Sequence, residues 1–556
     1  MISRIEVRDG ELADGRHNTG PPPMRCGRLL SALAAVVLAV GIGGCAYSFA
    51  KYPDDARVTV DEFTELLNKR KADNAANLTS QPNNAIVSLR QIFDGLGPGT
   101  PEFRVVQFIV LDSTEAIFTL QGAWAFGQDR NWSYESQGTV RKLATGWRIS
   151  WDPTIVIPHL DNTHTVQLVR AYAPPPPIVK DGHGQTLMTE QTIDVVKLDP
   201  ARITDPIATT DALAKAIEPI ASVITGPSLR EQLAAAQGKP VVAVNLRESD
   251  FAVLEPDIAP IPGVVTKAQP RLIAADRRVQ SPMLDALRVV WQDNRDRCAG
   301  WAVQLSSLDG LPIAYLTGQP GTPGPDVAAT LDPHWQRAAQ DAVNYVGNAT
   351  AAVVINSATG AIVAAAENNA VSTNGSAFTG LAPIGGTTEL LRTAAAKIAR
   401  KAPQDVSVDE VTKAAHMLGI GVDFGLTGLD KVTSRIPTPG TEQVRRGSQA
   451  SEIQASAYGM AIVAATIASG RIVRPMIEIG HPATASVESA PLPAEVVDRL
   501  RPMLGGSGYV AITGGQGWLL ANMGELAFAI HVEDPDSSAT LIHAAERILH
   551  PEPQPQ

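Results

Sequence analysis

Cysteine is scarce in this chain, which has three among 556 residues. Cys26 and Cys45 fall in an N-terminal stretch with the pattern of a targeting signal, so only Cys298 remains for the folded part. A single thiol cannot form an internal disulfide or supply the ligands of a cysteine-based metal site. The histidines lack metal-ligand spacing, and no glycine-rich phosphate loop follows a strand. We therefore expect no metal and no other cofactor.

The chain also lacks an excess of positive charge. Its formal net charge is −11, and no tract is rich in Lys or Arg, which argues against a nucleic-acid partner. Hydrophobic residues make up 44% and charged residues 19%, as is usual for a globular protein with sizeable cores. The length favours three or four domains.

The N-terminal stretch has the order of a secretory signal. A basic Met24-Arg-Cys-Gly-Arg28 precedes the apolar run 29–40 and then Gly41-Ile-Gly-Gly-Cys45. A Cys directly after small residues resembles a bacterial lipobox. That resemblance implies cleavage before Cys45, lipid on its sulfur, and attachment to the outer side of the cytoplasmic membrane. The alternative is an uncleaved signal anchor. Residues 1–45 are predicted to be leader and signal; the polar 1–23 precede a plausible initiator Met24.

Residues 48–160 are predicted to form the first folded domain. Apolar spacing predicts helices over 61–74 and 85–96, and alternation predicts strands over 103–110, 115–124, 132–143 and 146–151. Helices followed by a curved antiparallel sheet indicate an α+β cone. We expect Trp124, Trp132 and Trp147 to pack in its core. The stretch from Trp147 to Pro153 resembles the closing strand of the nuclear transport factor 2-like domains that precede some penicillin-binding proteins, including the methicillin-resistance type.

A polyproline linker, Pro174 to Pro177, marks the next boundary. Residues 178–187 resemble the opening of the dimerisation, or pedestal, domain of the same proteins, and this predicts a second domain over 170–322. Helices are predicted over 212–221, 228–237 and 281–293, with a strand over 240–244. A run rich in Gly and Pro, 318–325, then separates it from the rest.

Residues 326–550 carry the most specific resemblance to penicillin-binding proteins. It rests on Thr330-Leu-Asp332 with Gln336-Arg-Ala-Ala339, an apolar hairpin over 351–365, Leu418-Gly-Ile-Gly421, Arg446-Gly-Ser-Gln449 and the helix-Gly-strand run 458–475. The resemblance implies a multidomain α+β protein. Its parts would be a nuclear transport factor 2-like cone, a dimerisation domain and an α/β/α transpeptidase (β-lactamase-like) domain with a central antiparallel sheet.

The catalytic residues of that family are missing from the matching positions. The family's nucleophilic Ser falls on Gly386 and its Lys on Glu389, at the start of a predicted helix. The family's Lys-Thr-Gly strand falls on Ile512-Thr513-Gly514, so the cation has become isoleucine.

The family's Ser-x-Asn loop has no counterpart in the interval 393–417. Ser372-Thr-Asn374 precedes the nucleophile position, and we interpret it as a turn. Ser48-Phe-Ala-Lys51 is a Ser-x-x-Lys, but it lies three residues after Cys45, where no pocket can surround it.

These losses predict an inactive transpeptidase homologue in the cell envelope that acts in peptidoglycan synthesis or its regulation. Its partners would be the membrane and either cell-wall synthesis proteins or peptidoglycan. One alternative is an active D,D-transpeptidase or carboxypeptidase with a noncanonical nucleophile such as Thr387 or Thr388. Another is an envelope lipoprotein that binds a small ligand in the cone.

Overall fold

The computed structural model describes residues 54–308, 310–371, 375–437, 453–488 and 490–551. The signal, Cys45, Ser48–Lys51, Ser372–Asn374 and Arg446–Gln449 lie outside these ranges. Within them, no helix combines the length and the apolar character that crossing a membrane requires.

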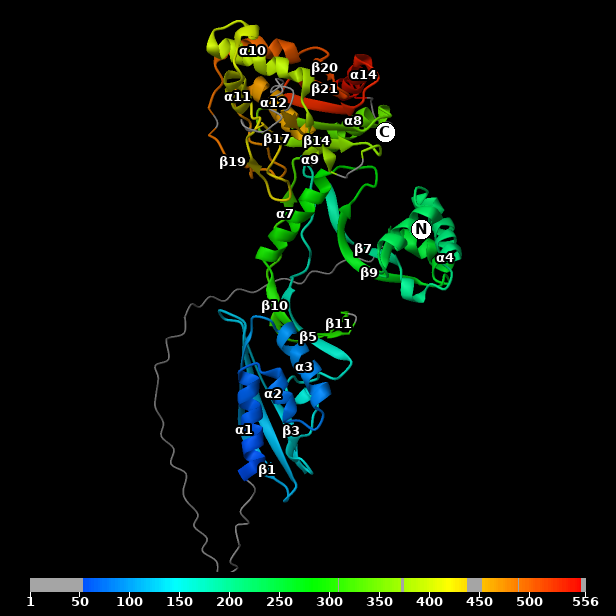
Figure 1. The fold of residues 1–556 in the computed structure, drawn as a ribbon, viewed down its shortest axis with the longest axis vertical. Helices are drawn as coiled ribbons and strands as arrows, with labels where there is room; N and C mark the ends of the chain where they lie inside the picture. The colour runs from blue at the N-terminus through cyan, green and yellow to red at the C-terminus, as the bar shows by residue number, and fades with distance from the viewer. Residues whose placement is uncertain (1–53, 309, 372–374, 438–452, 489, 552–556) are drawn as a thin grey trace, which may run out of the picture. The chain divides into compact units, whose positions relative to one another are not determined.

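The first domain packs three helices on a four-stranded antiparallel sheet (Figure 1). Its elements are α1 (Asp54–Asn68), α2 (Ala72–Asn77), α3 (Pro82–Gly95), β1 (Thr100–Val110), β2 (Glu115–Ala125), β3 (Asn131–Leu143) and β4 (Gly146–Ile149), with strand order β1-β2-β3-β4. Val60, Phe63 and Leu67 lie on one face of α1 and are fully buried, as their helical spacing predicts.

The predicted helix over 61–74 is wrong in its bounds, because the chain turns between α1 and α2. Arg70 adopts a left-handed backbone conformation with φ of 53°. Its guanidinium donates hydrogen bonds to the carbonyl oxygens of Gly97 (2.7 Å) and Gly99 (3.2 Å). These long-range hydrogen bonds stabilise the turn between α1 and α2. The apolar spacing of the sequence cannot predict them.

The tryptophans of this domain form its core, as the sequence predicts. Trp124, Trp132 and Trp147 are all buried in one cluster with the helices. The indole N–H of Trp124 donates to the hydroxyl of Tyr134 at 3.1 Å, and that hydroxyl donates to the carbonyl of Val156. Aromatic side chains therefore occupy the space between the sheet and the helices.

A second sheet adds residues from much later in the chain to this core. It has the order β11-β10-β5, from β5 (His164–Ala171), β10 (Gly300–Ser307) and β11 (Pro312–Gln319). Trp301 and Val303 join the core cluster of the first domain, and Trp301 packs on Phe126 with ring centres 5.6 Å apart. Residues 300–319 fall within the predicted segment 170–322, yet they pack against the N-terminal helices.

The next part of the chain forms a five-stranded sheet with flanking helices. Its strands are β6 (Val179–Lys180), β7 (Thr186–Leu198), β8 (Val241–Arg247), β9 (Val264–Ala274) and β12 (Val327–Ala328). Its helices are α4 (Pro206–Ala221), α5 (Gly226–Ala235), α6 (Glu248–Ile258) and α7 (Met283–Arg297). The sequence predicts α4, α5, β8 and α7 approximately; it misses β7, β9 and α6.

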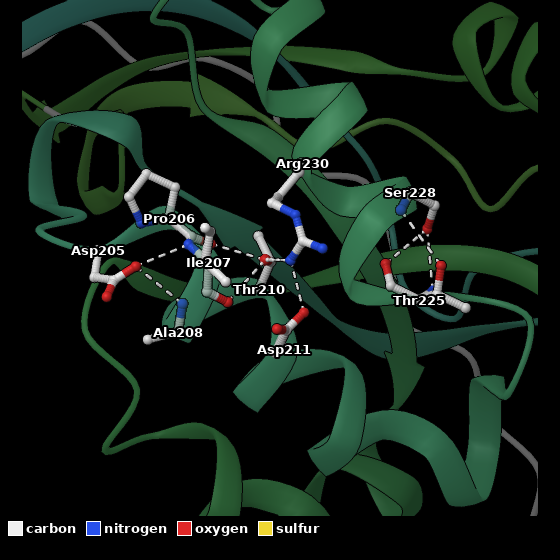
Figure 2. Close-up of polar contacts among 9 residues, drawn as sticks. All are labelled: Asp205, Pro206, Ile207, Ala208, Thr210, Asp211, Thr225, Ser228 and Arg230. Atoms are coloured by element: carbon white, nitrogen blue, oxygen red, sulfur yellow. Dashed lines mark hydrogen bonds and ion pairs between the residues drawn. The ribbon is translucent and has the colours of Figure 1, made fainter.

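Figure 2 shows the polar contacts that fix the first two of these helices. The carboxylate of Asp205 accepts hydrogen bonds from two backbone N–H groups in the first turn of α4, at 3.0 and 3.1 Å. Thr225 and Ser228 form a reciprocal capping box at the start of α5. Arg230 of α5 reaches Thr210 (2.9 Å) and Asp211 (2.7 Å) of α4. Capped helix ends and this bridge hold the pair together.

The C-terminal part is a five-stranded antiparallel sheet between two layers of helices. The strand order is β14 (Ile362–Glu367), β13 (Thr350–Asn356), β22 (Leu526–Glu533), β21 (Gln516–Met523) and β20 (Tyr509–Thr513). Helices α8 (Pro333–Tyr345) and α14 (Ser538–Leu549) pack on one face through Leu519 and Phe528. Helix α12 (Ala457–Ser469) packs on the other face, where Trp518 and Leu520 lie. Successive residues of these strands thus point to opposite faces of the sheet and pack in two separate cores.

Shorter elements complete this part of the chain. They are α9 (Ser376–Thr379), β15 (Ala382–Pro383), α10 (Thr388–Ala399), α11 (Val408–Met417), β16 (Phe424–Gly425), β17 (Ser434–Arg435), β18 (Gln454–Ala455), β19 (Thr484–Ala485) and α13 (Ala494–Leu500). The expected mixed α+β, multidomain organisation is confirmed.

Candidate functional site

The candidate site lies where the chain enters α10, beside strand β20. β15 pairs with β18, and the N–H of Ile384 donates to the carbonyl of Ile453 at 2.9 Å. The chain then turns at Gly385, whose φ of +50° suits glycine. A short 3-10 turn, Gly385–Thr387, leads into α10. The start of α10 is therefore fixed by a strand on one side and by β20 on the other.

Gly386, the predicted position of the family's nucleophile, lies directly against β20. A Cβ atom placed on Gly386 would be 3.0 Å from the Cβ of Ala511 and 3.1 Å from the Oγ1 of Thr513. Both distances are shorter than ordinary van der Waals contact. The structure thus brings together Gly386 and Thr513, which the sequence singles out, and even a methyl group at 386 would require Ala511 and Thr513 to shift by a few tenths of an ångström.

Two hydrogen bonds hold this close approach. The hydroxyl of Tyr509 donates to the carbonyl of Gly386 at 3.2 Å, and the indole of Trp518 donates to the carbonyl of Pro383 at 2.9 Å. Partial burial, and next the negative charge of Glu389, raise the pKa of Tyr509. Its hydroxyl therefore remains protonated and serves as a donor, because a phenol proton is acidic only well above neutral pH.

Ile512, the predicted position of the family's Lys, points away from Gly386. Ala511 and Thr513 face Gly386, and successive residues of a strand point to opposite sides. Ile512 shares the other face with Val510, which packs against the core beneath α14. A cation at 512 would therefore be on the wrong face to serve a group at 386.

The remaining predicted positions, Glu389 and Gly514, suit the helix start and the turn in which they lie. Glu389 is exposed in the first turn of α10. Gly514 lies in the turn between β20 and β21 with φ of +60°. A carboxylate at a helix N-terminus is favourable for the helix, and glycine suits the turn.

The two threonines considered as replacement nucleophiles are buried and hydrogen-bonded. Thr387 donates its hydroxyl proton to the carbonyl of Ile384 at 2.7 Å, and Thr388 donates to the carbonyl of Gly385 at 2.6 Å. Attack on a substrate requires an accessible hydroxyl with a base in reach of its proton. In this structure both protons are already donated to the backbone.

The connection in which the Ser-x-Asn loop is expected is short. It contains Arg400, in a left-handed conformation at the end of α10, a 3-10 turn over Pro403–Asp405, and Ser407, which caps α11. Lys401 donates to the carboxylate of Glu410 at 2.8 Å. That hydrogen bond, together with those from Ser407, lowers the pKa of Glu410 to about 2.

His531, a partly buried histidine, lies behind the site, and the sequence analysis did not single it out. His531 packs on Trp518 with ring centres 4.4 Å apart, and its Nε2 is 2.6 Å from the Oε1 of Gln516. Burial lowers the pKa of His531 to about 4, so the ring is neutral at pH 7. Tyr509 and Trp518 were missed as well. Nothing in the sequence around Tyr509 or Trp518 indicates that their polar atoms bond to the backbone just before α10.

Comparison with known families identifies the N-terminal domain. Residues 55–164 match the family described as the NTF2-like N-terminal transpeptidase domain. A search of curated proteins finds no match to the chain. The match covers the cone that residues 48–160 were predicted to form, and it links the chain to proteins in which such a domain precedes a transpeptidase.

Proposed function

We propose that this chain is a catalytically inactive relative of the penicillin-binding proteins, located in the cell envelope, that acts in peptidoglycan synthesis or its regulation. It would act by binding cell-wall synthesis proteins or peptidoglycan. The observation that carries this proposal is the contact between Gly386 and β20. A nucleophile is absent there, and even a Cβ atom at 386 would press on Ala511 and Thr513 of the strand.

Serine acyl transfer depends on a nucleophile and a base that act as a unit. Removing the Ser from a serine hydrolase costs on the order of a millionfold in turnover. Here the matching base position holds Glu389, which carries the opposite charge to a lysine. The cation that would hold the substrate carboxylate is replaced by Ile512, on the far face of β20. We therefore expect weak binding of penicillins even without acylation.

The retained architecture supports a binding role. The helix layers on both faces of the C-terminal sheet are well packed, and α12 is buried from Ala457 to Ile467. A chain that had lost all constraint on this part would not be expected to keep so continuous a core. The N-terminal transpeptidase-associated domain supports the same assignment.

The proposed location is the outer side of the cytoplasmic membrane, with a lipid on Cys45. The support for it is the basic, apolar and small-residue order of residues 24–45. Helix α1 begins at Asp54, nine positions after Cys45, so the folded part would follow the anchor almost at once.

The alternatives are disfavoured by particular contacts. An active enzyme would need a nucleophile in place of Gly386, and the hydroxyls of Thr387 and Thr388 are bonded to backbone carbonyls. A ligand site among the core aromatics of the cone is disfavoured, because Trp124 and its neighbours pack there. The hollow of about 400 Å³ in this part of the chain lies elsewhere, against Asn84, Ile92 and Leu308.

Labelling with a fluorescent penicillin tests the loss of activity. Membranes containing the full-length chain are labelled, and the active penicillin-binding proteins of the same membranes serve as the internal control. We expect those proteins to fluoresce and this chain to remain dark at the same penicillin concentration. A covalent adduct that maps to the start of α10 would overturn the proposal.

A pull-down from the same membranes tests the binding role. Cross-linking before detergent extraction should retain cell-wall synthesis proteins or peptidoglycan fragments with the full-length chain. The matched control is a lipoprotein of similar abundance that lacks these domains. If the two preparations retain the same material, a role through wall partners is excluded.

A further inference from the structure

A second surface of interest lies at the end of the N-terminal domain where α1 begins. The guanidinium of Arg57, in the first turns of α1, lies 5.6 Å from the ring centre of Phe108, near the end of β1. At the other end of α1, Asn68 exchanges hydrogen bonds with the backbone of Phe103. Helix α1 therefore runs opposite to β1, and it begins at the end of the sheet where β1 passes into β2 (Figure 1).

Three aliphatic side chains are exposed at this end. The exposed fractions are 45% for Ile109, 53% for Leu111 and 44% for Leu143. We call these three residues the distal rim. Single exposed aliphatic residues are common on protein surfaces and require no explanation. Three exposed aliphatic residues grouped at one end of a sheet do require an explanation.

Backbone hydrogen bonds bring the members of the distal rim to one place. The N–H of Leu111 donates to the carbonyl of Glu115 at 3.0 Å, and the N–H of Lys142 donates to the carbonyl of Thr114 at 2.8 Å. The turn between β1 and β2 is thereby joined to the end of β3, next to Leu143. The residues of the distal rim thus lie close together, at the end of the sheet where β1 passes into β2.

The distal rim lies on the outer face of the sheet. Phe108 and Val110 contact the core, so Ile109 between them points outward. On β3, Val140 is buried while Arg141 and Leu143 are exposed, which places Leu143 on the outer face as well.

Charged side chains of both signs flank the distal rim. Lys142 is exposed, and Arg141 is paired with Glu115 at 2.9 Å. The carboxylate of Asp112 accepts hydrogen bonds from the hydroxyl and the N–H of Thr114 and from the N–H of Glu115, which lower the pKa of Asp112 and keep it charged. Aliphatic groups beside a long cationic side chain such as that of Lys142 suit the boundary between lipid headgroups and acyl chains.

We propose that the distal rim rests on the surface of the membrane to which the N-terminal segment attaches the chain. This inference relies on the membrane attachment proposed above. The nine positions from Cys45 to Asp54 can span at most about 30 Å, so attachment at Cys45 confines the start of α1 to that distance from the bilayer. Aliphatic side chains at an interface enter the boundary region by about 5–10 Å. The occupant of this surface is therefore lipid, not a soluble protein.

Site-specific fluorescence tests this contact on the full-length chain. Cys26 and Cys298 are replaced by serine, Cys45 is kept, and Leu111→Cys carries an environment-sensitive dye whose position is verified by peptide mass. The matched control carries the dye at Gln128→Cys, which is exposed in the turn at the opposite end of β2. Both chains are reconstituted in vesicles of phosphatidylethanolamine and phosphatidylglycerol, with quencher-bearing lipids added to half of each sample.

We expect the dye at 111 to shift to the blue and to be quenched several-fold more strongly than the dye at 128. Leu143→Cys should give the same result as Leu111→Cys. If the chain floats with the vesicles but the dye at 111 is as exposed to water as that at 128, the rim contact is overturned and the attachment stands. If the chain does not float with vesicles, both are overturned. A blue shift that grows with protein density and shows no lipid quenching would assign the rim to a protein contact and overturn the proposal.

Discussion

The hydroxyl of Tyr509 donates a hydrogen bond of 3.2 Å to the carbonyl of Gly386 and so ties strand β20 to the start of α10. The contact between these two elements is a packing contact in this structure. If the chain is inactive, as proposed, mutations at this contact should change stability and not turnover.

Replacement of Tyr509 by phenylalanine tests this bond. A hydrogen bond of this kind contributes about 1 kcal/mol to the free energy of unfolding, and Tyr509→Phe should lose about that amount. Chemical denaturation of the full-length chain measures it. Tyr315→Phe, on an exposed side chain for which no hydrogen bond is found, should leave the unfolding free energy unchanged. Equal effects of the two variants would contradict the prediction.

Introduction of a methyl group at Gly386 tests the closeness of β20. Gly386→Ala places a Cβ 3.0 Å from that of Ala511, and overpacking of this kind costs about 1–3 kcal/mol of stability. Gly347→Ala is the control, because a Cβ at that position meets no atom within 4 Å. A melting temperature that falls for Gly386→Ala alone is the expected result.

Restoring the family's residue types should not restore acylation. The triple variant Gly386→Ser, Glu389→Lys and Ile512→Lys supplies a hydroxyl and two amines, but the amine at 512 lies on the face of β20 that points away from position 386. We expect no labelling by fluorescent penicillin under conditions in which an active penicillin-binding protein is saturated. Labelling of the triple variant would show that β20 can rotate or shift in register.

The partly buried His531 predicts a loss of stability in mild acid. Its pKa is lowered from 6.5 to about 4 by burial, so the unfolded chain binds a proton between these values and the folded chain does not. Stability is therefore complete above pH 6.5 and falls as the pH decreases toward 4, by up to about 3 kcal/mol. The carboxylate of Glu410, whose pKa is lowered to about 2, loses its contribution only below about pH 4.5.

Denaturation curves over this pH range test the role of His531. His531→Gln removes the titrating group, so the difference in unfolding free energy between wild type and variant should change between pH 6.5 and 4 and level off outside that window. A constant difference for His531→Gln would show that another group causes the acid effect.

Trp301 should stabilise a domain that lies far from it in the sequence. It packs in the core of the N-terminal helices and on Phe126, and replacing a buried Trp by Ala costs about 3–5 kcal/mol. Trp301→Ala should therefore expose sites in residues 54–160 to limited proteolysis. Tyr315→Ala, on the neighbouring strand but exposed, should not. Protection of 54–160 in both variants would contradict the shared core.

Local patterns predict the elements that depend on local spacing. The four strands of the first sheet follow the alternation of buried and exposed residues, and the helix α3 follows its apolar stripe. The pairing of β5 with β10 joins segments that are more than a hundred residues apart, and no periodicity encodes such a pairing. Helix α3 approaches that sheet so closely that a Cβ on Gly95 would lie 2.0 Å from the carbonyl oxygen of Val166.

The candidate site was predictable in part. Resemblance alone placed Gly386 and Thr513 at corresponding motif positions, and the structure brings them into contact. The face on which Ile512 lies depends on strand register, and the bond from Tyr509 depends on how closely β20 approaches α10. Both depend on tertiary packing, which a sequence motif does not specify.

The sheet of the N-terminal domain also sets a distance. The chain enters this domain beside the end of β1 and leaves it through strands that contact the opposite end, at Phe126 and Trp301. Strands of 11 to 13 residues extend roughly 40 Å. The point where the chain enters this domain and the strands through which it leaves are therefore held about that far apart, by the length of β1 to β3.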